Sequence, residues 1–309
     1  MKKIKVLLVG SGNMATEHHK AFSSMPEFFF SGVVARNKNK LKQFSKKLKI
    51  PYYSTNIREA CLEIKPDLVI IAVSELSTYK ICKKISNYKS VLFIEKPLGY
   101  DYLQTKKIVT LFKNKKIRAF IALNRRHFSS TRKLHSILSN QNGKRLITVN
   151  DQEDLIQQKK NNVAQKVINN FMYANSVHLI DYFNILCRGK LEKIKTYNSY
   201  NKPPFFVHSI LNFSSGDKGI YYAIYNKEAP WFITAQISNK IYTLKPLEKL
   251  SSNHKIKNKK IKFSDDKNFK PGFKLQAKEI LNFFQGKKYY LPDYQEMFKT
   301  VKIIKKIYN

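Results

Sequence analysis

Short runs of apolar residues alternate with amphipathic stretches in the first part of the chain. The runs are typical of buried strands, because a parallel sheet covered on both faces has no polar side. We predict strands at Ile4–Val9, Phe29–Ala35, Leu68–Val73, Val91–Ile94 and Arg118–Ala122. Helical spacing predicts helices at Met14–Met25, Lys38–Leu48, Leu76–Ile85 and Tyr102–Phe112. This alternation predicts a doubly wound α/β Rossmann domain over residues 1–123.

The pattern changes after residue 123. We predict a helix at Ser129–Leu138, a strand at Lys144–Asp151, a polar loop over 157–170 and a helix at Val177–Leu186. From Lys193 to Leu247, strand-like runs are broken by turn residues at 201–204, 214–218, 226–230 and 238–240, which indicates an antiparallel sheet. Helices at Lys274–Phe284 and Tyr294–Ile307 follow a basic loop over 253–262. We predict an α+β second domain, 124–309, whose last helices can pack back on the first.

Composition places the chain among folded globular proteins, since 43% of its 309 residues are hydrophobic. Its net charge of +37 raises a nucleic acid or another polyanion as a partner. The lysine excess accompanies heavy use of Asn, Ile, Tyr and Phe, however, which is typical of an A/T-rich coding bias. No basic motif with interleaved aromatic residues indicates specific nucleic-acid binding. A polyanion binder therefore stays as a remote alternative.

The N-terminal apolar run is too short for a signal peptide, and no stretch approaches the roughly 20 apolar residues of a membrane span. Cys61, Cys82 and Cys187 are isolated and odd in number, which favours neither a disulfide framework nor a zinc site. These observations predict a cytoplasmic protein without a bound metal.

A glycine turn, Gly10-Ser11-Gly12-Asn13-Met14-Ala15, follows the first predicted strand and opens the first predicted helix. Gly10 permits a tight turn, Gly12 allows the backbone to approach a pyrophosphate, and Ala15 permits close packing of helix and strand. The amides at the helix start favour phosphate. The turn predicts a dinucleotide site, although a simple turn is the alternative.

The end of the second predicted strand carries no acid. An acidic residue there normally binds the ribose hydroxyls of NAD, whereas this chain has Arg36, which can pair with a 2′-phosphate. The cofactor is thus expected to be NADP or NAD, with a preference for NADP.

The run from Val91 to Gly99 leads an apolar strand into Glu95, Lys96 and Pro97. Pro97 keeps Lys96 extended at the carboxyl end of the strand, the edge where open α/β sheets bind ligands. Side chains alternate along a strand, so one of Glu95 and Lys96 can face a crevice.

These motifs together resemble the Gfo/Idh/MocA oxidoreductases, which include glucose–fructose oxidoreductase and inositol dehydrogenase. The similarity extends over nearly the whole chain, through Arg36-Asn37, Leu123-Asn124-Arg125-Arg126, the run from Tyr242 to Glu248 and Pro271-Gly272-Phe273. The resemblance implies hydride transfer between a nicotinamide and a sugar, nucleotide sugar or cyclitol, in carbohydrate or surface-polysaccharide metabolism, by a homodimer or homotetramer. It also implies cofactor contacts from Ser74, Glu95 and Lys96, besides those of the glycine turn.

The resemblance further implies that Lys96 contacts the nicotinamide ribose and a substrate hydroxyl, and that a histidine acts as general acid/base. The family pattern of Asp, three residues, His, two residues and Asp corresponds to Ala174, His178 and Asp181, so the first acid is missing. A second departure is Thr78, where relatives usually carry a histidine. His178 could instead be a structural histidine paired with Asp181, and the chain could be a dinucleotide-binding protein with reduced or no dehydrogenase activity.

Three further residues are candidates for substrate binding. Asn175 could hold a substrate hydroxyl but cannot titrate. Arg125 and Arg126 follow the sixth predicted strand, where substrate would pass, and either could equally form a structural ion pair. Of the remaining histidines, His18 and His19 are adjacent on the first predicted helix and point in different directions, and the others have no ligand-like spacing, namely His127, His135, His208 and His254.

Overall fold

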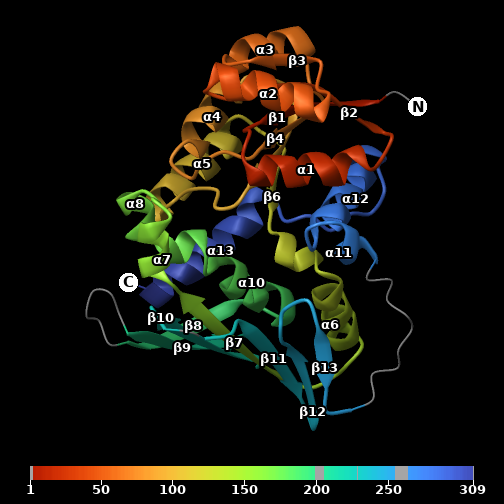
Figure 1. Cartoon of the computed structure of the whole chain (residues 1–309). Coiled ribbons are helices and arrows are strands. Elements are labelled where there is room, and N and C mark those ends of the chain that lie inside the picture. The colour runs from red at the N-terminus through yellow and green to blue at the C-terminus, as the bar shows by residue number, and fades with distance from the viewer. Residues whose placement is uncertain (1–2, 199–204, 228, 255–263, 309) are drawn as a thin grey trace. The chain divides into compact units, whose positions relative to one another are not determined.

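The computed structural model in Figure 1 describes residues 3–198, 205–227, 229–254 and 264–308. The chain divides into two compact units. The first comprises residues 1–124 and 265–298, and the second comprises 125–264 and 299–309. A segment near the end of the chain therefore returns to the first unit.

The first unit is built on a six-stranded sheet in the order β3-β2-β1-β4-β5-β6, in which the paired strands are parallel. The strands are β1 (Ile4–Val9), β2 (Phe28–Val34), β3 (Tyr52–Ser54), β4 (Leu68–Ile71), β5 (Val91–Glu95) and β6 (Ala119–Ala122). The helices are α1 (Asn13–Ser23), α2 (Lys38–Leu48), α3 (Ile57–Ile64), α4 (Thr78–Ile85), α5 (Tyr102–Asn114), α11 (Ser264–Asn268) and α12 (Phe273–Phe284). The predicted Rossmann domain is confirmed.

Five strands and four helices of this unit lie where the apolar pattern predicts them, with ends that differ by a few residues. The sequence analysis assigned no element between residues 49 and 67, where β3 and α3 lie. Both are short, and β3 is an edge strand without a continuous apolar run, so its pattern carries little signal.

Helix α12 completes the core of the first unit. Figure 1 shows it beside α1, and its Phe273, Ala277 and Ile280 are buried in the same cluster as Phe22 and Phe93. Burial of a large apolar side chain such as Phe273 or Ile280 contributes about 1.5–3 kcal/mol to folding.

The second unit contains a seven-stranded sheet in the order β13-β12-β11-β7-β10-β9-β8. Its strands are β7 (Arg145–Glu153), β8 (Leu191–Asn198), β9 (Phe206–Phe213), β10 (Lys218–Tyr225), β11 (Phe232–Ile237), β12 (Lys240–Leu244) and β13 (Leu250–Ser252). The predicted, mostly antiparallel sheet is confirmed, although β7 pairs with β10 in parallel. The turn predicted at 201–204 and most of the basic loop at 253–262 lie outside the described residues.

Helices of the second unit precede and follow the strand β7. They are η1 (Asn124–His127), α6 (Ser129–Ser139), α7 (Leu155–Lys160), α8 (Gln165–Ile168), α9 (Phe171–Ala174) and α10 (Val177–Leu186), while α13 (Tyr294–Tyr308) contributes to both units. The prediction of a loop over 157–170 is wrong. Asp154 caps α7 by accepting a hydrogen bond from the Gln157 amide, and α8 is anchored by the buried Val167 and Ile168.

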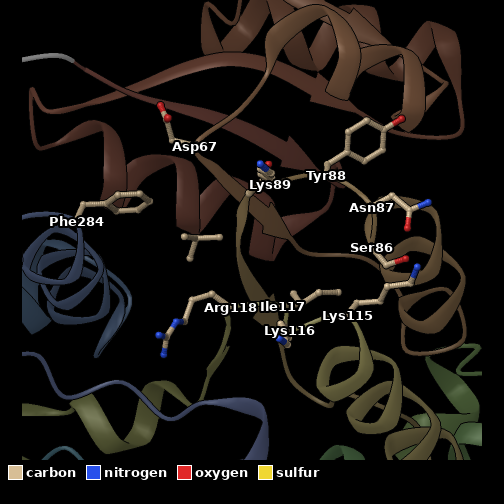
Figure 2. Close-up of a pocket in the computed structure, with 12 residues that line it drawn as sticks. Asp67, Ser86, Asn87, Tyr88, Lys89, Lys115, Lys116, Ile117, Arg118 and Phe284 are labelled. Carbon is tan, nitrogen blue, oxygen red and sulfur yellow. The ribbon is translucent and has the colours of Figure 1, made fainter.

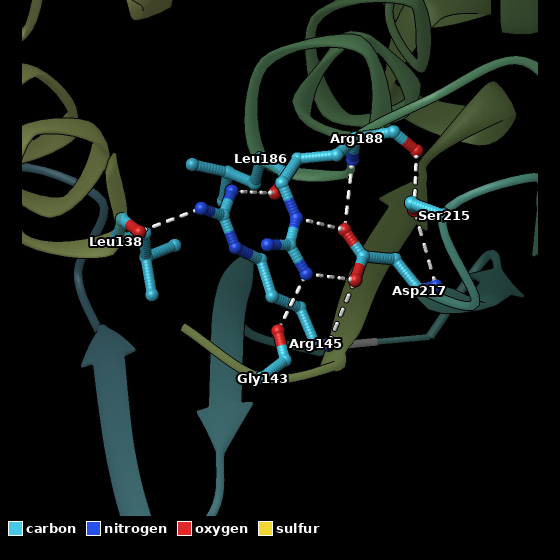
Figure 3. A network of polar contacts seen from close by, with 7 residues as sticks. All are labelled: Leu138, Gly143, Arg145, Leu186, Arg188, Ser215 and Asp217. Atoms are coloured by element: carbon cyan, nitrogen blue, oxygen red, sulfur yellow. Dashed lines mark hydrogen bonds and ion pairs between the residues drawn. The ribbon is translucent and has the colours of Figure 1, made fainter. Parts of the chain in front are cut away.

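A polar network ties the strands to the helices in the second unit (Figure 3). Both carboxylate oxygens of the buried Asp217 accept hydrogen bonds from the Arg188 guanidinium, at 2.7 and 3.0 Å. The Arg145 amide donates to Asp217 Oδ1, and the Arg145 side chain donates to the carbonyls of Leu138 and Leu186. Asp217 thereby joins the starts of β7 and β10 to the end of α10.

No helix in the described parts of the chain is long and apolar enough to cross a membrane.

Candidate functional site

The glycine turn after β1 has a backbone that only glycine accommodates. Gly10 has a φ of +121°, and its amide donates a 2.8 Å hydrogen bond to the carbonyl of Val34. A Cβ placed on Gly10 would lie 2.0 Å from the carbonyl oxygen of Ala72. The turn is therefore held between β2 and the end of β4, and any side chain at Gly10 would displace it.

Gly12 leaves the start of helix α1 open. It is the N-cap residue, no side chain caps the helix, and a Cβ added to Gly12 would meet nothing within 4 Å. The first amides of α1 thus lack a side-chain acceptor, while the buried Ala15 packs the helix close to the sheet. This arrangement fits the pyrophosphate of a dinucleotide, with Ser11, Asn13 and Met14 on the same segment.

The other predicted cofactor residues follow strands of the same parallel sheet. Arg36 is exposed beyond the end of β2, and Asn37 caps α2 by accepting a hydrogen bond from the Lys40 amide. Ser74 is exposed beyond β4, and its hydroxyl lies 3.0 Å from that of Ser77. Because all strands run in parallel, these residues share one edge of the sheet with the glycine turn and Lys96.

His18 connects helix α1 to the end of β5. Its Nε2 lies 2.7 Å from Glu95 Oε1, and the other carboxylate oxygen accepts a 3.2 Å hydrogen bond from the Lys96 amide. The His18 ring is fully buried and packs against Phe273 at 4.6 Å between ring centres. No site role was predicted for His18, because it is adjacent to His19 and the two side chains point in different directions on the helix. Its partner lies 77 residues away, so local spacing carries no signal for this pair.

A cavity of about 480 Å³ lies at the opposite edge of the sheet (Figure 2). It is lined by residues that precede β4, β5 and β6, among them Asp67, Lys89 and Arg118. Since ligands of open α/β sheets bind at the carboxyl ends of the strands, this cavity is not the dinucleotide site.

Apart from Lys96, the predicted substrate residues lie in the second unit. His178 is buried in the first turn of α10, with 7% of its surface exposed. Asn175 precedes this helix, and its side-chain nitrogen Nδ2 donates a 3.0 Å hydrogen bond to the backbone carbonyl of Gln152 on β7. Ala174, at the position where the resemblance implies an acid, is buried at the end of α9.

Arg125 and Arg126 have different surroundings. Arg126 forms a buried bidentate ion pair with Asp181, at 2.6 and 2.8 Å, and Thr300 donates to the same carboxylate. Of the two alternatives for Arg126, the structure shows the structural ion pair. The guanidinium of Arg125 lies 4.6 Å from the ring centre of Trp231. Burial lowers the pKa of Arg125, and the charge of Asp151 is among the effects that oppose this.

Two buried carboxyl groups near α10 were not predicted. Asp151 and Glu153 lie on β7 with 1% and 0% of their surfaces exposed, and Tyr221 donates a 2.8 Å hydrogen bond to Asp151. Asp151 and Glu153 lie beside the polar Asn150 and Gln152 in the sequence, so the pattern of this strand did not indicate that they are buried.

Among the described residues, no group of three or more His, Cys, Asp or Glu side chains is arranged to bind a metal ion. The three cysteines are buried free thiols. Burial raises the pKa of Cys61 to about 11 and that of Cys82 to about 12, so these thiols are protonated at neutral pH.

Comparison with known proteins relates the first unit to a family. Residues 4–123 match the oxidoreductase family GFO_IDH_MocA, described as having an NAD-binding Rossmann fold. A sequence search of curated proteins finds no match.

Solved structures share the fold over both units. The WlbA dehydrogenase from Bordetella pertussis, in complex with NADH and UDP-GlcNAcA, has a TM-score of 0.82 at 15% identity, covering 99% of this chain and 95% of its own. The UDP-N-acetylglucosamine 3-dehydrogenase GnnA from Acidithiobacillus ferrooxidans has a TM-score of 0.77 at 11% identity, with coverage of 99% and 97%. An oxidoreductase from Thermotoga maritima has a TM-score of 0.79 at 20% identity, with coverage of 98% and 95%.

The glycine turn, the parallel sheet and the match over residues 4–123 agree with the resemblance in the sequence, and the mixed sheet of the second unit completes the same two-domain fold. Residues 4–123 thus match the Gfo/Idh/MocA oxidoreductase family with its NAD-binding Rossmann fold, and the whole chain shares the two-domain fold of solved dehydrogenases.

Proposed function

We propose that the protein transfers a hydride between a bound NAD(P) and a hydroxyl-bearing carbon of a sugar, nucleotide sugar or cyclitol. One observation carries this proposal: the open glycine turn and Lys96 lie at the same edge of the parallel sheet. A hydrogen bond between His18 and Glu95 connects the helix that follows the turn to the strand that precedes Lys96. The dinucleotide, when bound, supplies the hydride chemistry, and the protein supplies position and charge.

The proposed roles of the residues follow from their chemistry. Oxidation of an alcohol releases a hydroxyl proton, which His178 accepts as general base, because an imidazole titrates near neutral pH. Lys96 stabilises the negative charge that develops on the alcohol oxygen. Asn175 and Arg125 hold the substrate. In the reverse direction His178 donates the proton as general acid.

Neighbouring structures support a sugar as the substrate class. One similar protein is in complex with UDP-GlcNAcA and another is a UDP-N-acetylglucosamine 3-dehydrogenase. A third is described as a putative myo-inositol dehydrogenase from Sinorhizobium meliloti. We therefore place the protein in carbohydrate or surface-polysaccharide metabolism in the cytoplasm.

The direct test is a panel of sugars, nucleotide sugars and cyclitols offered to the purified protein with oxidised or reduced cofactor, followed by nicotinamide absorbance. Turnover of at least one panel member, abolished in His178→Ala, is the expected result. Tight cofactor binding without turnover of any member would favour the second candidate, a dinucleotide-binding protein with reduced or no dehydrogenase activity. Ala174 is the observation that favours this second candidate.

NADP is the proposed cofactor in preference to NAD. Arg36 is exposed at the end of β2, and residues 34–38 contain no acid that would repel a 2′-phosphate. Arg36→Glu should weaken NADP binding tenfold or more, roughly the loss of one charge-assisted pair of about 1.5–3 kcal/mol, and leave NAD binding nearly unchanged. Equal dissociation constants of the wild-type protein for NAD and NADP would contradict the preference.

A homodimer or homotetramer is the proposed assembly. Alternate side chains of β9 and β10 are only partly buried and largely apolar on one face of the sheet, namely Phe206, Ile210, Ile220, Tyr222 and Ile224. A second copy of the chain would cover this face. The solution mass should exceed that of the 36.2 kDa chain at least twofold, and Ile220→Lys with Tyr222→Lys should reduce it.

A further inference from the structure

We propose that Glu153 is held as a neutral carboxylic acid and that its hydrogen bond to Ser176 positions the first turn of α10, which carries His178. The inference rests on the proposed function, in which His178 acts on the substrate. Residue 174, one turn before His178, is alanine and has no side chain that could hydrogen-bond to that histidine.

The residues involved lie together in the interior of the second unit. Glu153 is the last residue of β7, and Asp151 lies two residues earlier on the same face of that strand. Ser176 immediately precedes α10. All three are buried, with exposed fractions of 0%, 1% and 0% respectively. Two carboxyl groups therefore share a site that water does not reach in the described structure.

Hydrogen bonds connect the two carboxyl groups through two hydroxyls. Ser176 Oγ is hydrogen-bonded to Glu153 Oε1. The Tyr221 hydroxyl lies 3.2 Å from Ser176 Oγ and 2.8 Å from Asp151 Oδ2. The Tyr308 hydroxyl lies 2.7 Å from that of Tyr221. A chain of hydrogen bonds thus runs from Glu153 through Ser176 and Tyr221 to Asp151.

When each contact holds its own hydrogen and Tyr308 donates to Tyr221, a count of hydrogens leaves one carboxyl group protonated. This chain of hydrogen bonds has three contacts: Glu153 with Ser176, Ser176 with Tyr221, and Tyr221 with Asp151. Each contact needs a hydrogen between its two oxygens. Ser176 and Tyr221 each have one hydroxyl hydrogen. The hydroxyl of Tyr308 serves its own contact with Tyr221. The third hydrogen therefore comes from a carboxyl group at one end of the chain.

The surroundings assign this proton to Glu153. Asp151 accepts a second hydrogen bond, from the Gln152 amide at 2.7 Å, and the positive charge of Arg125 stabilises its ionised form. Glu153 Oε2 has no hydrogen-bond partner among the described residues. Burial raises the pKa of both carboxyl groups. The nearby charge of Asp151 raises the pKa of Glu153 further, so that it lies well above its ordinary value although hydrogen bonds from Ser176 and Asn175 act to lower it. The other titratable groups that act on this pair are Tyr221 and Tyr225 on β10 and Tyr308 on α13.

This chain of hydrogen bonds fixes the segment from which α10 begins. The carbonyl of Ser176 accepts hydrogen bonds from the amides of Leu179 and Ile180 at 2.9 and 2.8 Å. The His178 amide donates to the carbonyl of Asn175 at 3.2 Å, and the Asn175 side chain is tied to β7. With Ser176 bound to Glu153, both residues before the helix are anchored to the same strand. Ala174 can add only backbone hydrogen bonds.

The protonation state can be measured directly in the full-length protein without any substrate. Infrared spectroscopy at neutral pH should show the carbonyl stretch of a buried protonated carboxyl group. Glu153→Gln should remove this band, whereas Asp151→Asn and the exposed control Glu248→Gln should retain it. Absence of the band from the wild-type protein, or its persistence in Glu153→Gln, overturns the assignment.

The positioning role is measured at His178 itself. The NMR titration midpoint of the His178 ring should shift by about half a pH unit or more in Glu153→Leu and stay in place in Glu153→Gln, whose amide still donates to Ser176. An unshifted midpoint in a folded Glu153→Leu protein overturns the role.

Activity provides an independent comparison where turnover is found. Glu153→Leu should lower kcat about tenfold with little change in KM, and Glu153→Gln should restore kcat to within about threefold and keep the pH profile. Equal kcat values for Glu153→Leu and the wild-type protein would overturn the role. Failure of every sugar to react overturns the proposed function instead, while the infrared and NMR results still decide this inference.

Discussion

His18 Nε2 and Glu95 Oε1 lie 2.7 Å apart in the interior of the Rossmann domain, joining the helix that follows the glycine turn to the strand that ends at Lys96. Glu95 also accepts a hydrogen bond from the Lys96 amide. The Glu95 carboxylate therefore holds the Lys96 backbone and helix α1 together. Because α1 begins at the glycine turn, this contact sets the position of Lys96 relative to the proposed phosphate site. This pair makes the geometry of the cofactor edge depend on His18, which belongs to none of the motifs considered in the sequence.

Removal of His18 should destabilise the protein and disturb Lys96. His18→Ala removes the side chain that hydrogen-bonds to Oε1 of the largely buried Glu95. We therefore expect a loss of about 1.5–3 kcal/mol in the free energy of unfolding. Chemical denaturation measures this loss. His18→Gln keeps a donor on a side chain of similar reach and should recover part of it. His19→Ala, at the adjacent and less buried histidine, is the matched control, and an equal loss in that variant would contradict the special role of His18.

Lys96 should affect turnover far more than cofactor binding. Lys96→Ala removes a positive charge that acts mainly on the developing alkoxide, so kcat should fall about 10²-fold or more while the dissociation constant of the dinucleotide changes little. Lys89→Ala is a matched control, because Lys89 is exposed beside the cavity at the opposite edge of the sheet (Figure 2). A parallel loss of binding and turnover in Lys96→Ala would argue against this role.

The two glycines of the turn should respond differently to alanine. Gly10→Ala places a Cβ against the carbonyl of Ala72 at a strained φ, and we expect a loss of about 2 kcal/mol or more in the free energy of unfolding. Gly12→Ala meets no protein atom, so the protein should keep its melting temperature and lose affinity for the dinucleotide. Thermal unfolding and cofactor titration of both variants distinguish the two effects. Unchanged dinucleotide affinity in Gly12→Ala would contradict the phosphate site.

Asp217 should make stability sensitive to acid. Desolvation acts to raise the pKa of Asp217, but hydrogen bonds and charge from Arg188, with the Arg145 amide, lower it overall (Figure 3). A lowered folded-state pKa contributes stability that is present above the unfolded value of about 3.9 and is lost as pH falls through the folded value. Asp217→Asn should cost about 1–3 kcal/mol at neutral pH and flatten the decline in stability below about pH 4. An unchanged acid limb in denaturation curves of Asp217→Asn would refute the assignment.

The family-specific part of the fold could be predicted from the sequence because its signals are local. Buried parallel strands need consecutive apolar residues, so the strands of the Rossmann domain lie close to their predicted positions. The glycine turn is equally local, since Gly10 needs its unusual φ and Gly12 needs open space whatever the rest of the chain does. The elements missed were short, such as β3 and α8, because a few residues carry little periodic signal.

The partners of the buried polar side chains were decided only by the tertiary structure. His18 finds Glu95 across 77 residues, Arg126 finds Asp181 across 55, and Tyr221 finds Asp151 across 70. Strand order and helix packing bring these side chains together, and a polar residue in the sequence does not show whether it will be buried. The sequence by itself thus determined the Rossmann domain and its cofactor turn. The tertiary structure decided which charges are paired, because burial and long-range contacts set the cost of leaving a polar group alone.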